Sequence, residues 1–229
     1  MRIGFIHTVG FLVENFREQM RQAYPHADCF HILNESLLQD LLRRAPQALV
    51  YRRVVEQILL ADQADADLIV VTCSSTSPSV DIARTLTNKT ILKIDDPMAA
   101  LAVRNGPRIG LLCTSTSTVE PSSALLCAHA AQQGVDIDIQ VLAVPEAYQA
   151  LLAGDRAIHD QLIESAVTQL LGKIDVLMLA QASLAHLRER LAGLLPVQVL
   201  ASPSLLMEDI GRHITEYEQR THSIEGSQS

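Results

Sequence analysis

The sequence predicts an α/β protein of two pseudo-symmetric lobes, each a four-stranded, mainly parallel sheet flanked by helices, with the active site between the lobes. Three observations predict this fold. Short apolar runs alternate with longer segments of helical spacing, which is typical of parallel βαβ units. Segments of the first half recur about 106 residues later in the chain. The 229 residues are 48% hydrophobic and can bury a large core.

Eight strands are expected in chain order, each a short and mostly apolar run. They are residues 2–7, 28–33, 67–72, 90–94, 108–113, 136–142, 175–180 and 197–201. Helices are expected between the strands, notably at residues 48–64, 118–133, 157–171 and 184–194, and Pro203 marks the start of the last helix. The polar segment 221–229 lacks periodicity and is expected to be a frayed tail.

The internal repeat rests on three matches that occur in the same order in both halves. Residues 3–8 match 109–114, residues 67–73 match 175–181, and residues 94–97 match 200–203. The repeat predicts a first lobe of residues 1–97 plus 204–229 and a second lobe of residues 98–203. In such folds ligands bind at the carboxyl ends of the strands, so the strand-end residues become the site candidates.

Composition excludes several classes of protein. Twenty-six acidic against 18 basic residues give a net charge of −8, which repels the phosphates of nucleic acid. Every apolar run is far shorter than the roughly 20 residues that span a membrane, and the N-terminus has no signal-peptide pattern. We therefore expect a cytoplasmic protein with neither a nucleic-acid partner nor a membrane partner.

Neither a metal nor a cofactor is expected. The cysteines show no zinc spacing, the histidines show no ligand spacing, and no glycine-rich phosphate motif is present. The segment 154–160 contains His159 and Asp160, but it is interpreted as a helix cap. Cys29, Cys113 and Cys127 are interpreted as core residues.

Cys73 is the candidate for chemistry. It ends a buried strand and precedes four hydroxyl residues, including Ser74 and Ser75, and then Pro78. A thiolate at such a turn is stabilised by free N–H groups, and the hydroxyls can hold a carboxylate. The alternative is a small core cysteine before a Ser/Thr-rich helix cap; the repeat favours function because it directs Cys73 toward the ligand.

Further candidates follow from the same repeat. Thr114, Ser115 and Thr116 form a second hydroxyl-rich turn that suits an anion, although a helix cap explains it as well. His7 and Thr8 occupy the equivalent turn of the first half. Tyr51 and His159 correspond in the repeat and could donate to a substrate carboxylate. Positive charge could come from three arginines that equally suit a solvated helix start: Arg52, Arg53 and Arg156.

With these residues the chain resembles the aspartate/glutamate/hydantoin racemase superfamily, which includes maleate isomerase and arylmalonate decarboxylase. The resemblance rests on the duplicated halves, on Thr72-Cys73-Ser74-Ser75, on the turn at residues 110–118 and on Ser202-Pro203. It implies a cofactor-independent enzyme in which two opposed cysteines move a proton at the carbon next to a carboxylate. It also implies a homodimer or higher homo-oligomer, with Cys73 as the first cysteine.

The place of the second cysteine is taken by Gln181, whose amide cannot act as an acid or base. We expect a racemase or isomerase acting on a small amino acid or dicarboxylate, with Cys73 as base or nucleophile. Gln181 and Ser183 would orient the substrate, and the hydroxyls at residues 74–75 and 114–116 would stabilise an enediolate. The alternatives are a decarboxylase of a malonate-like acid and a non-catalytic carboxylate-binding protein.

Overall fold

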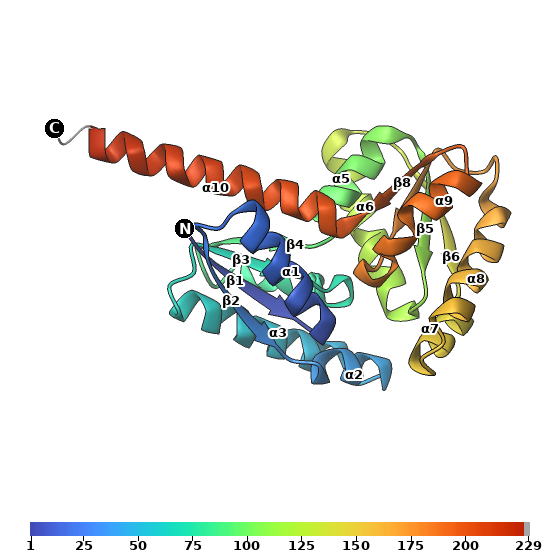
Figure 1. Ribbon diagram of the computed structural model, residues 1–229, viewed down its shortest axis with the longest axis horizontal. Helices are drawn as coiled ribbons and strands as arrows, with labels where there is room; N and C mark the ends of the chain where they lie inside the picture. Colours follow the sequence, from blue (N-terminus) through green and yellow to red (C-terminus); the bar gives the residue numbers. More distant parts are fainter. Residues whose placement is uncertain (227–229) are drawn as a thin grey trace. The chain divides into compact units, whose positions relative to one another are not determined.

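The computed structural model describes residues 1–226, in which strands and helices alternate along the chain (Figure 1). The chain divides into two compact units, Met1–Ile94 with the segment from Leu206 onward, and Asp95–Leu205. Each unit contains one four-stranded sheet, ordered β2-β1-β3-β4 in the first unit and β6-β5-β7-β8 in the second. All strand pairs are parallel, which confirms the predicted α/β fold with two sheets.

The first unit is built around β3, a strand whose four residues are all buried because helices cover both faces of a parallel sheet. The strands are β1 (Arg2–His7), β2 (Asp28–Leu33), β3 (Leu68–Val71) and β4 (Thr90–Lys93). The helices are α1 (Gly10–Ala23), α2 (Ser36–Leu42), α3 (Gln47–Gln63), the single turn η1 (Ser74–Thr76) and α4 (Pro78–Ala83). Helix α3 buries Val50, Val54 and Ile58, which share one helix face.

The second unit repeats this plan around β7, which is also fully buried. Its strands are β5 (Arg108–Cys113), β6 (Asp138–Ala143), β7 (Val176–Leu179) and β8 (Gln198–Ala201). Its helices are α5 (Asp96–Asn105), α6 (Val119–Gln133), α7 (Pro145–Leu152), α8 (Arg156–Val167) and α9 (Arg188–Leu194), with the short turns η2 (Thr116–Thr118), η3 (Thr168–Leu170) and η4 (Ala182–Leu187).

The sequence repeat corresponds to a repeat of contacts. The backbone N–H of Arg2 donates to Asp67 in the first unit (2.6 Å), and the N–H of Arg108 donates to Asp175 in the second (3.0 Å). Gly4 and Gly110 also correspond, because a Cβ at either position would lie within 3.0 Å of a neighbouring side chain. The first strand of each sheet therefore needs a glycine where neighbouring side chains pack closely over it.

The last helix, α10 (Ser202–Gly226), is longer than expected. Residues 221–226 were expected to fray, but they are helical; residues 227–229 lie outside the described residues. A polar helix can be held by contacts one turn apart, and here the Thr221 hydroxyl donates to the carbonyl oxygen of Tyr217 (3.0 Å). Among the described residues, no helix combines the length and apolar character that crossing a membrane requires.

Candidate active site

Cys73 is separated from β3 by Thr72 alone and lies at the carboxyl end of a central strand of the first sheet. Its backbone is still extended (φ −132°, ψ 113°), and η1 begins at the next residue. The Cys73 carbonyl oxygen accepts hydrogen bonds from the backbone N–H of Thr76 (3.2 Å) and from its hydroxyl (3.1 Å). These contacts fix the turn that carries the thiol, and the residue is 8% exposed.

Hydroxyl groups follow Cys73 as the sequence indicated. Ser74, Ser75, Thr76 and Ser77 are all buried. The Ser77 hydroxyl donates to the Cys73 carbonyl oxygen at 3.4 Å, so two of these four side chains stabilise the turn itself. Ser74 and Ser75 are the two predicted substrate-binding residues of this turn.

A chain of polar side chains lies behind Cys73. The Thr72 hydroxyl is 3.0 Å from the carbonyl oxygen of Ile6 and 2.8 Å from Nδ1 of His7. Nε2 of His7 is 2.9 Å from Nδ1 of His31, and both rings stack on Phe5. Burial lowers the pKa of His7 to about 3, helped by repulsion from His31 and Arg17. Burial likewise lowers the pKa of His31, so both rings are neutral at ordinary pH.

His7 and Thr8 were both predicted to bind substrate, and the structure places them differently. His7 has no exposed surface and contacts Thr72, which precedes Cys73 in the chain. The Thr8 hydroxyl is buried and has no hydrogen-bond partner within residues 1–226. Ile6 pairs with Val71 in the parallel sheet, so Thr8 and Cys73 follow neighbouring strands at the same edge. The predicted contacts of both residues with substrate stay predictions.

In the second unit, Gln181 occupies the place after β7 that Cys73 occupies after β3. Its side-chain oxygen accepts hydrogen bonds from the backbone N–H groups of Thr114 (2.6 Å) and Ser115 (3.1 Å) and from the Thr114 hydroxyl (3.1 Å). Three donors converging on one oxygen form the arrangement that suits a carboxylate oxygen. The turn that was predicted to bind an anion therefore forms hydrogen bonds with Gln181, which was predicted to orient the substrate.

The other predicted residues differ in their exposure and in the elements that carry them. Thr116 is exposed in η2, and Ser183 is partly exposed in η4. Tyr51 is a partly buried residue of α3. Of the arginines, Arg52 pairs with Glu56, Arg53 pairs with Asp40, and Arg156 is exposed at the first position of α8.

The cysteine predictions are only partly correct. Cys113 is fully buried in β5, and burial raises the pKa of its thiol to about 11. Cys29 is half-buried on the edge strand β2, where burial and the neighbouring Asp28 raise its thiol pKa to about 11. Cys127 was expected in the core but is exposed on α6. One-sided burial of α6 explains the error, because an apolar residue type alone does not reveal which face of a helix it occupies.

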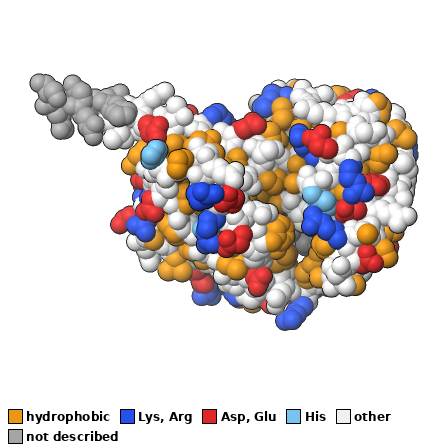
Figure 2. Space-filling view, in the orientation of Figure 1, with side chains coloured by type: hydrophobic (Ala, Val, Ile, Leu, Met, Phe, Trp, Pro, Cys, Tyr) orange, Lys and Arg blue, Asp and Glu red, His pale blue; other side chains and the backbone are white. Residues whose placement is uncertain are grey.

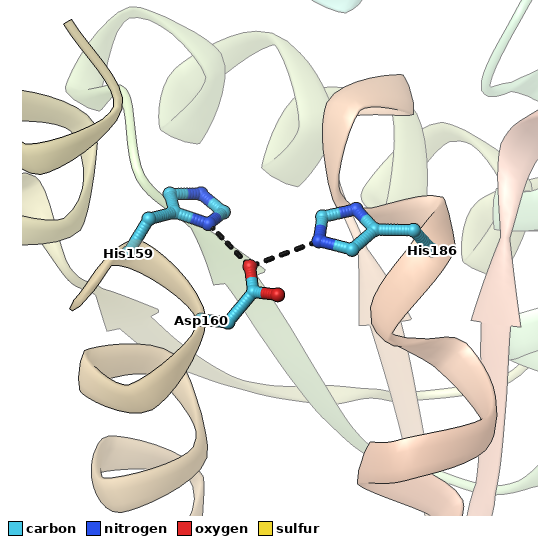
Figure 3. Close-up of side chains that lie close together, drawn as sticks. All are labelled: His159, Asp160 and His186. Carbon is cyan, nitrogen blue, oxygen red and sulfur yellow. Dashed lines mark hydrogen bonds and ion pairs between the residues drawn. The ribbon is translucent and has the colours of Figure 1, made fainter. Parts of the chain in front are cut away.

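A polar cluster that sequence reasoning did not assemble lies in the second unit (Figure 3). Asp160 Oδ1 is 2.7 Å from Nδ1 of His159 and 2.9 Å from Nε2 of His186. Burial raises the pKa of Asp160, but the contacts with His186 and His159 outweigh this and hold it below its usual value. His159 is 1% exposed, and its predicted contact with a substrate stays a prediction.

Spacing in the sequence does not reveal this cluster. The cap predicted at residues 154–160 exists, because Asp155 accepts a hydrogen bond from the backbone N–H of Ile158 (3.0 Å). His159 and Asp160 lie inside α8, however, and His186 belongs to η4. Asp160 and His186 are 26 residues apart, so only the packing of α8 against the following elements brings them together.

Two duplicated parallel sheets, with Cys73 after a central strand of one and a hydroxyl-rich turn after β5 of the other, define a racemase-type α/β fold. The family model for Asp/Glu/Hydantoin racemase matches residues 8–210. The chain belongs to this family, which confirms the predicted resemblance and the enzyme class, an isomerase.

Solved structures show the same fold. Glutamate racemase from Aquifex pyrophilus is 20% identical, with a TM-score of 0.69 over 93% of this chain and 84% of its own. Glutamate racemase from Francisella tularensis, in complex with D-glutamate, is 14% identical, with a TM-score of 0.75 over 95% and 81%. Allantoin racemase from Klebsiella pneumoniae is 18% identical, with a TM-score of 0.66 over 94% and 88%. No curated protein sequence matches the chain.

Proposed function

We propose that the protein moves a proton at the carbon next to the carboxylate of a small amino acid or dicarboxylate, with Cys73 as base or nucleophile. The observation that carries the proposal is the position of Cys73. It lies at the carboxyl end of the central strand β3, after Thr72, and opens a turn of buried hydroxyls in a chain of the racemase family. A thiolate at such a place can accept a proton from carbon and return it.

Removal of the proton leaves its electron pair in an enediolate, which must be stabilised by hydrogen-bond donors. The sequence predicts such donors at the turn after β5, where the backbone N–H groups of Thr114 and Ser115 and the Thr114 hydroxyl converge on one oxygen. A substrate carboxylate oxygen would replace the Gln181 side-chain oxygen there. Thr8, Ser74 and Ser75 are assigned to the substrate near Cys73, and His7 positions that strand end through Thr72.

Because Gln181 cannot transfer a proton, one thiol must perform the whole reaction. Cys73 can remove the proton and return it to the same face of the carbon, which exchanges hydrogen without inverting the centre. It can also add to a carbon–carbon double bond and leave again after rotation, which isomerises an unsaturated acid. The predicted contacts of Tyr51, Thr116 and Ser183 with substrate stay predictions.

A second candidate, decarboxylation of a malonate-like acid, is favoured by the same single thiol. Loss of carbon dioxide leaves an enediolate with the electron pair of the broken bond, and one proton from Cys73 completes the reaction. Such a reaction needs an acid on one face of the carbon only, and of the two equivalent strand ends only the one after β3 carries a thiol.

The test is exchange of the α-proton in deuterated buffer, followed by NMR over a panel of small amino, hydroxy and dicarboxylic acids. We expect exchange by the unmodified protein and its loss in Cys73→Ser, because a hydroxyl is a far weaker base. Cys127→Ser is the matched control, since Cys127 is an exposed thiol of the other unit, on α6. Exchange undiminished in Cys73→Ser would overturn the assignment of Cys73.

Loss of carbon dioxide without exchange would instead establish the decarboxylase. Binding of acids without either reaction would leave a carboxylate-binding protein, the third prediction from the sequence.

A further inference from the structure

We propose that His159, Asp160 and His186 bind one divalent metal ion of the zinc type. The three residues lie in α8 and η4 of the second unit, and one potential ligand atom from each lies within 4.8 Å of the others (Figure 3). The proposal does not depend on the proposed function, because it uses none of the strand-end residues assigned to the substrate.

The hydrogen-bond partners of His186 carry the argument. Its Nδ1 lies 2.9 Å from the carbonyl oxygen of Ser183, an acceptor, so Nδ1 must carry a hydrogen. In the neutral ring Nε2 then presents a lone pair, and it faces the Asp160 carboxylate at 2.9 Å. Two lone pairs at this distance repel each other unless a positive centre, either a proton or a metal ion, lies between them. A backbone carbonyl that fixes the tautomer of an imidazole is also the usual outer contact of a metal-binding histidine.

To hold the ion, the two contacts of Asp160 must open, and the two ring nitrogens, which lie within 4.8 Å of each other, must end about 3.3 Å apart. His159 Nδ1 lies 2.7 Å from the same Asp160 oxygen that His186 approaches. Tetrahedral zinc with bonds of about 2.0–2.2 Å places its ligand atoms roughly 3.3 Å apart, so each contact would open by about half an ångström. The other ring nitrogen of His159, Nε2, has no hydrogen-bond partner in the described part of the chain. Tilting this ring therefore breaks no second hydrogen bond.

The net charge of this cluster and its access from solvent also favour binding of a cation. Arg190 contacts the second oxygen of Asp160 (3.0 Å) and Glu164 (2.5 Å), which leaves the first oxygen of Asp160 for the metal. Two carboxylates against one arginine leave a net charge of −1 if both rings are neutral. The His159 and Asp160 side chains are 1% and 11% exposed, whereas that of His186 is 27% exposed and gives a route from solvent. Two nitrogens and one oxygen suit zinc, with water as the fourth ligand.

The experiment is titration of the full-length, chelator-treated protein with Zn²⁺ by calorimetry and with Co²⁺ by visible absorption. We expect one site in the unmodified protein, and affinity at least about tenfold weaker in His186→Ala and in Asp160→Asn. The matched control is His129→Ala, because Nε2 of His129 contacts Asp96 (2.7 Å) in another His–Asp pair of the same unit. The control should bind Zn²⁺ as the unmodified protein does.

Equal Zn²⁺ affinity in the unmodified protein and in His186→Ala would overturn the site, as would absence of binding in the unmodified protein. The second result would mean that a proton alone lies between His186 and Asp160. A Co²⁺ spectrum with thiolate bands would also overturn it, since it would assign the ion to cysteine. If His186→Ala does not fold, as judged by circular dichroism, His186→Gln replaces it, because it keeps a polar group but no imidazole.

Discussion

At the residue scale, the two central strands end in side chains of different chemistry. Cys73 follows β3 and can exchange a proton, whereas Gln181 follows β7 and cannot. Gln181 instead gives its oxygen to the donors of Thr114 and Ser115, where a carboxylate oxygen would fit. The duplicated strand ends are therefore chemically unequal, with a thiol in one unit and an amide held by three hydrogen-bond donors in the other.

Replacement of Gln181 tests whether its side chain competes with a carboxylate for these donors. In Gln181→Ala the two N–H groups and the Thr114 hydroxyl lose their partner, which costs about 1–3 kcal/mol of unfolding free energy. Small carboxylates should then raise the melting temperature more than they do for the unmodified protein. The measurement is thermal unfolding against the concentration of each acid.

Gln181→Glu is the companion variant, because it puts a carboxylate on the same donors and should abolish the response to added acids. A weaker response in Gln181→Ala than in the unmodified protein would contradict the competition. It would favour the other interpretation, in which the Gln181 side chain contacts the substrate.

At the scale of elements, the packing on each sheet depends on a glycine in its first strand. A Cβ at Gly110 would lie 2.9 Å from Ile174 Cδ1 and 3.0 Å from Leu177 Cδ1, and one at Gly4 would lie 2.7 Å from the ring of Phe30. The ring is rigid, whereas the methyl groups lie at the ends of flexible side chains. The side chains around Gly110 can therefore move more easily to make room for a methyl group than the Phe30 ring beside Gly4 can.

We predict that Gly4→Ala lowers the free energy of unfolding by about 1–3 kcal/mol and that Gly110→Ala lowers it less, because overpacking forces neighbouring groups to move. The measurement is unfolding by urea. Gly193→Ala in α9 is the control, since a Cβ there meets nothing within 4 Å. It should leave stability unchanged or raise it by about 0.5 kcal/mol. A larger loss for Gly110→Ala than for Gly4→Ala would contradict the packing argument.

At the scale of the whole molecule, charge is spread over the surface while the buried histidines control the response to pH. On the face shown in Figure 2, Lys and Arg side chains are interspersed with Asp and Glu side chains, as expected for a solvated surface. In the interior, the pKa of His7 is lowered from 6.5 to about 3, and that of His31 is lowered as well. The predicted homo-oligomer stays a prediction.

Acid should therefore destabilise the protein well before its carboxylates titrate. Between pH 6.5 and about 3 the unfolded chain binds a proton at His7 that the folded chain does not bind. The free energy of unfolding should fall as the pH drops below 6.5, by about 1.4 kcal/mol per pH unit from His7 alone once the pH is well below 6.5. Urea unfolding between pH 7 and pH 5 measures this slope, and His7→Gln should reduce it.

His26→Gln is the control, because His26 is exposed. An equal slope in His7→Gln and in the unmodified protein would show that His7 does not carry the pH dependence.

The sequence by itself determined the eight strands, the alternation with helices, the duplication, the family and the strand-end residues Cys73 and Gln181. These features are local or repeated: a buried strand needs a run of apolar residues, and a duplication appears as matching segments. The sequence analysis made two errors for a similar reason. The polar composition of residues 221–226 does not indicate a helix, and the residue type of Cys127 does not indicate which face of α6 it occupies.

Only the tertiary structure decided which polar groups meet. The contact of Gln181 with Thr114 joins residues 67 positions apart, and that of Asp160 with His186 joins residues 26 positions apart. Such pairs depend on how strands and helices pack, and no spacing rule within one element encodes them. The tertiary structure also placed the Thr72 hydroxyl 2.8 Å from Nδ1 of His7, a contact that joins residues 65 positions apart at the ends of neighbouring strands.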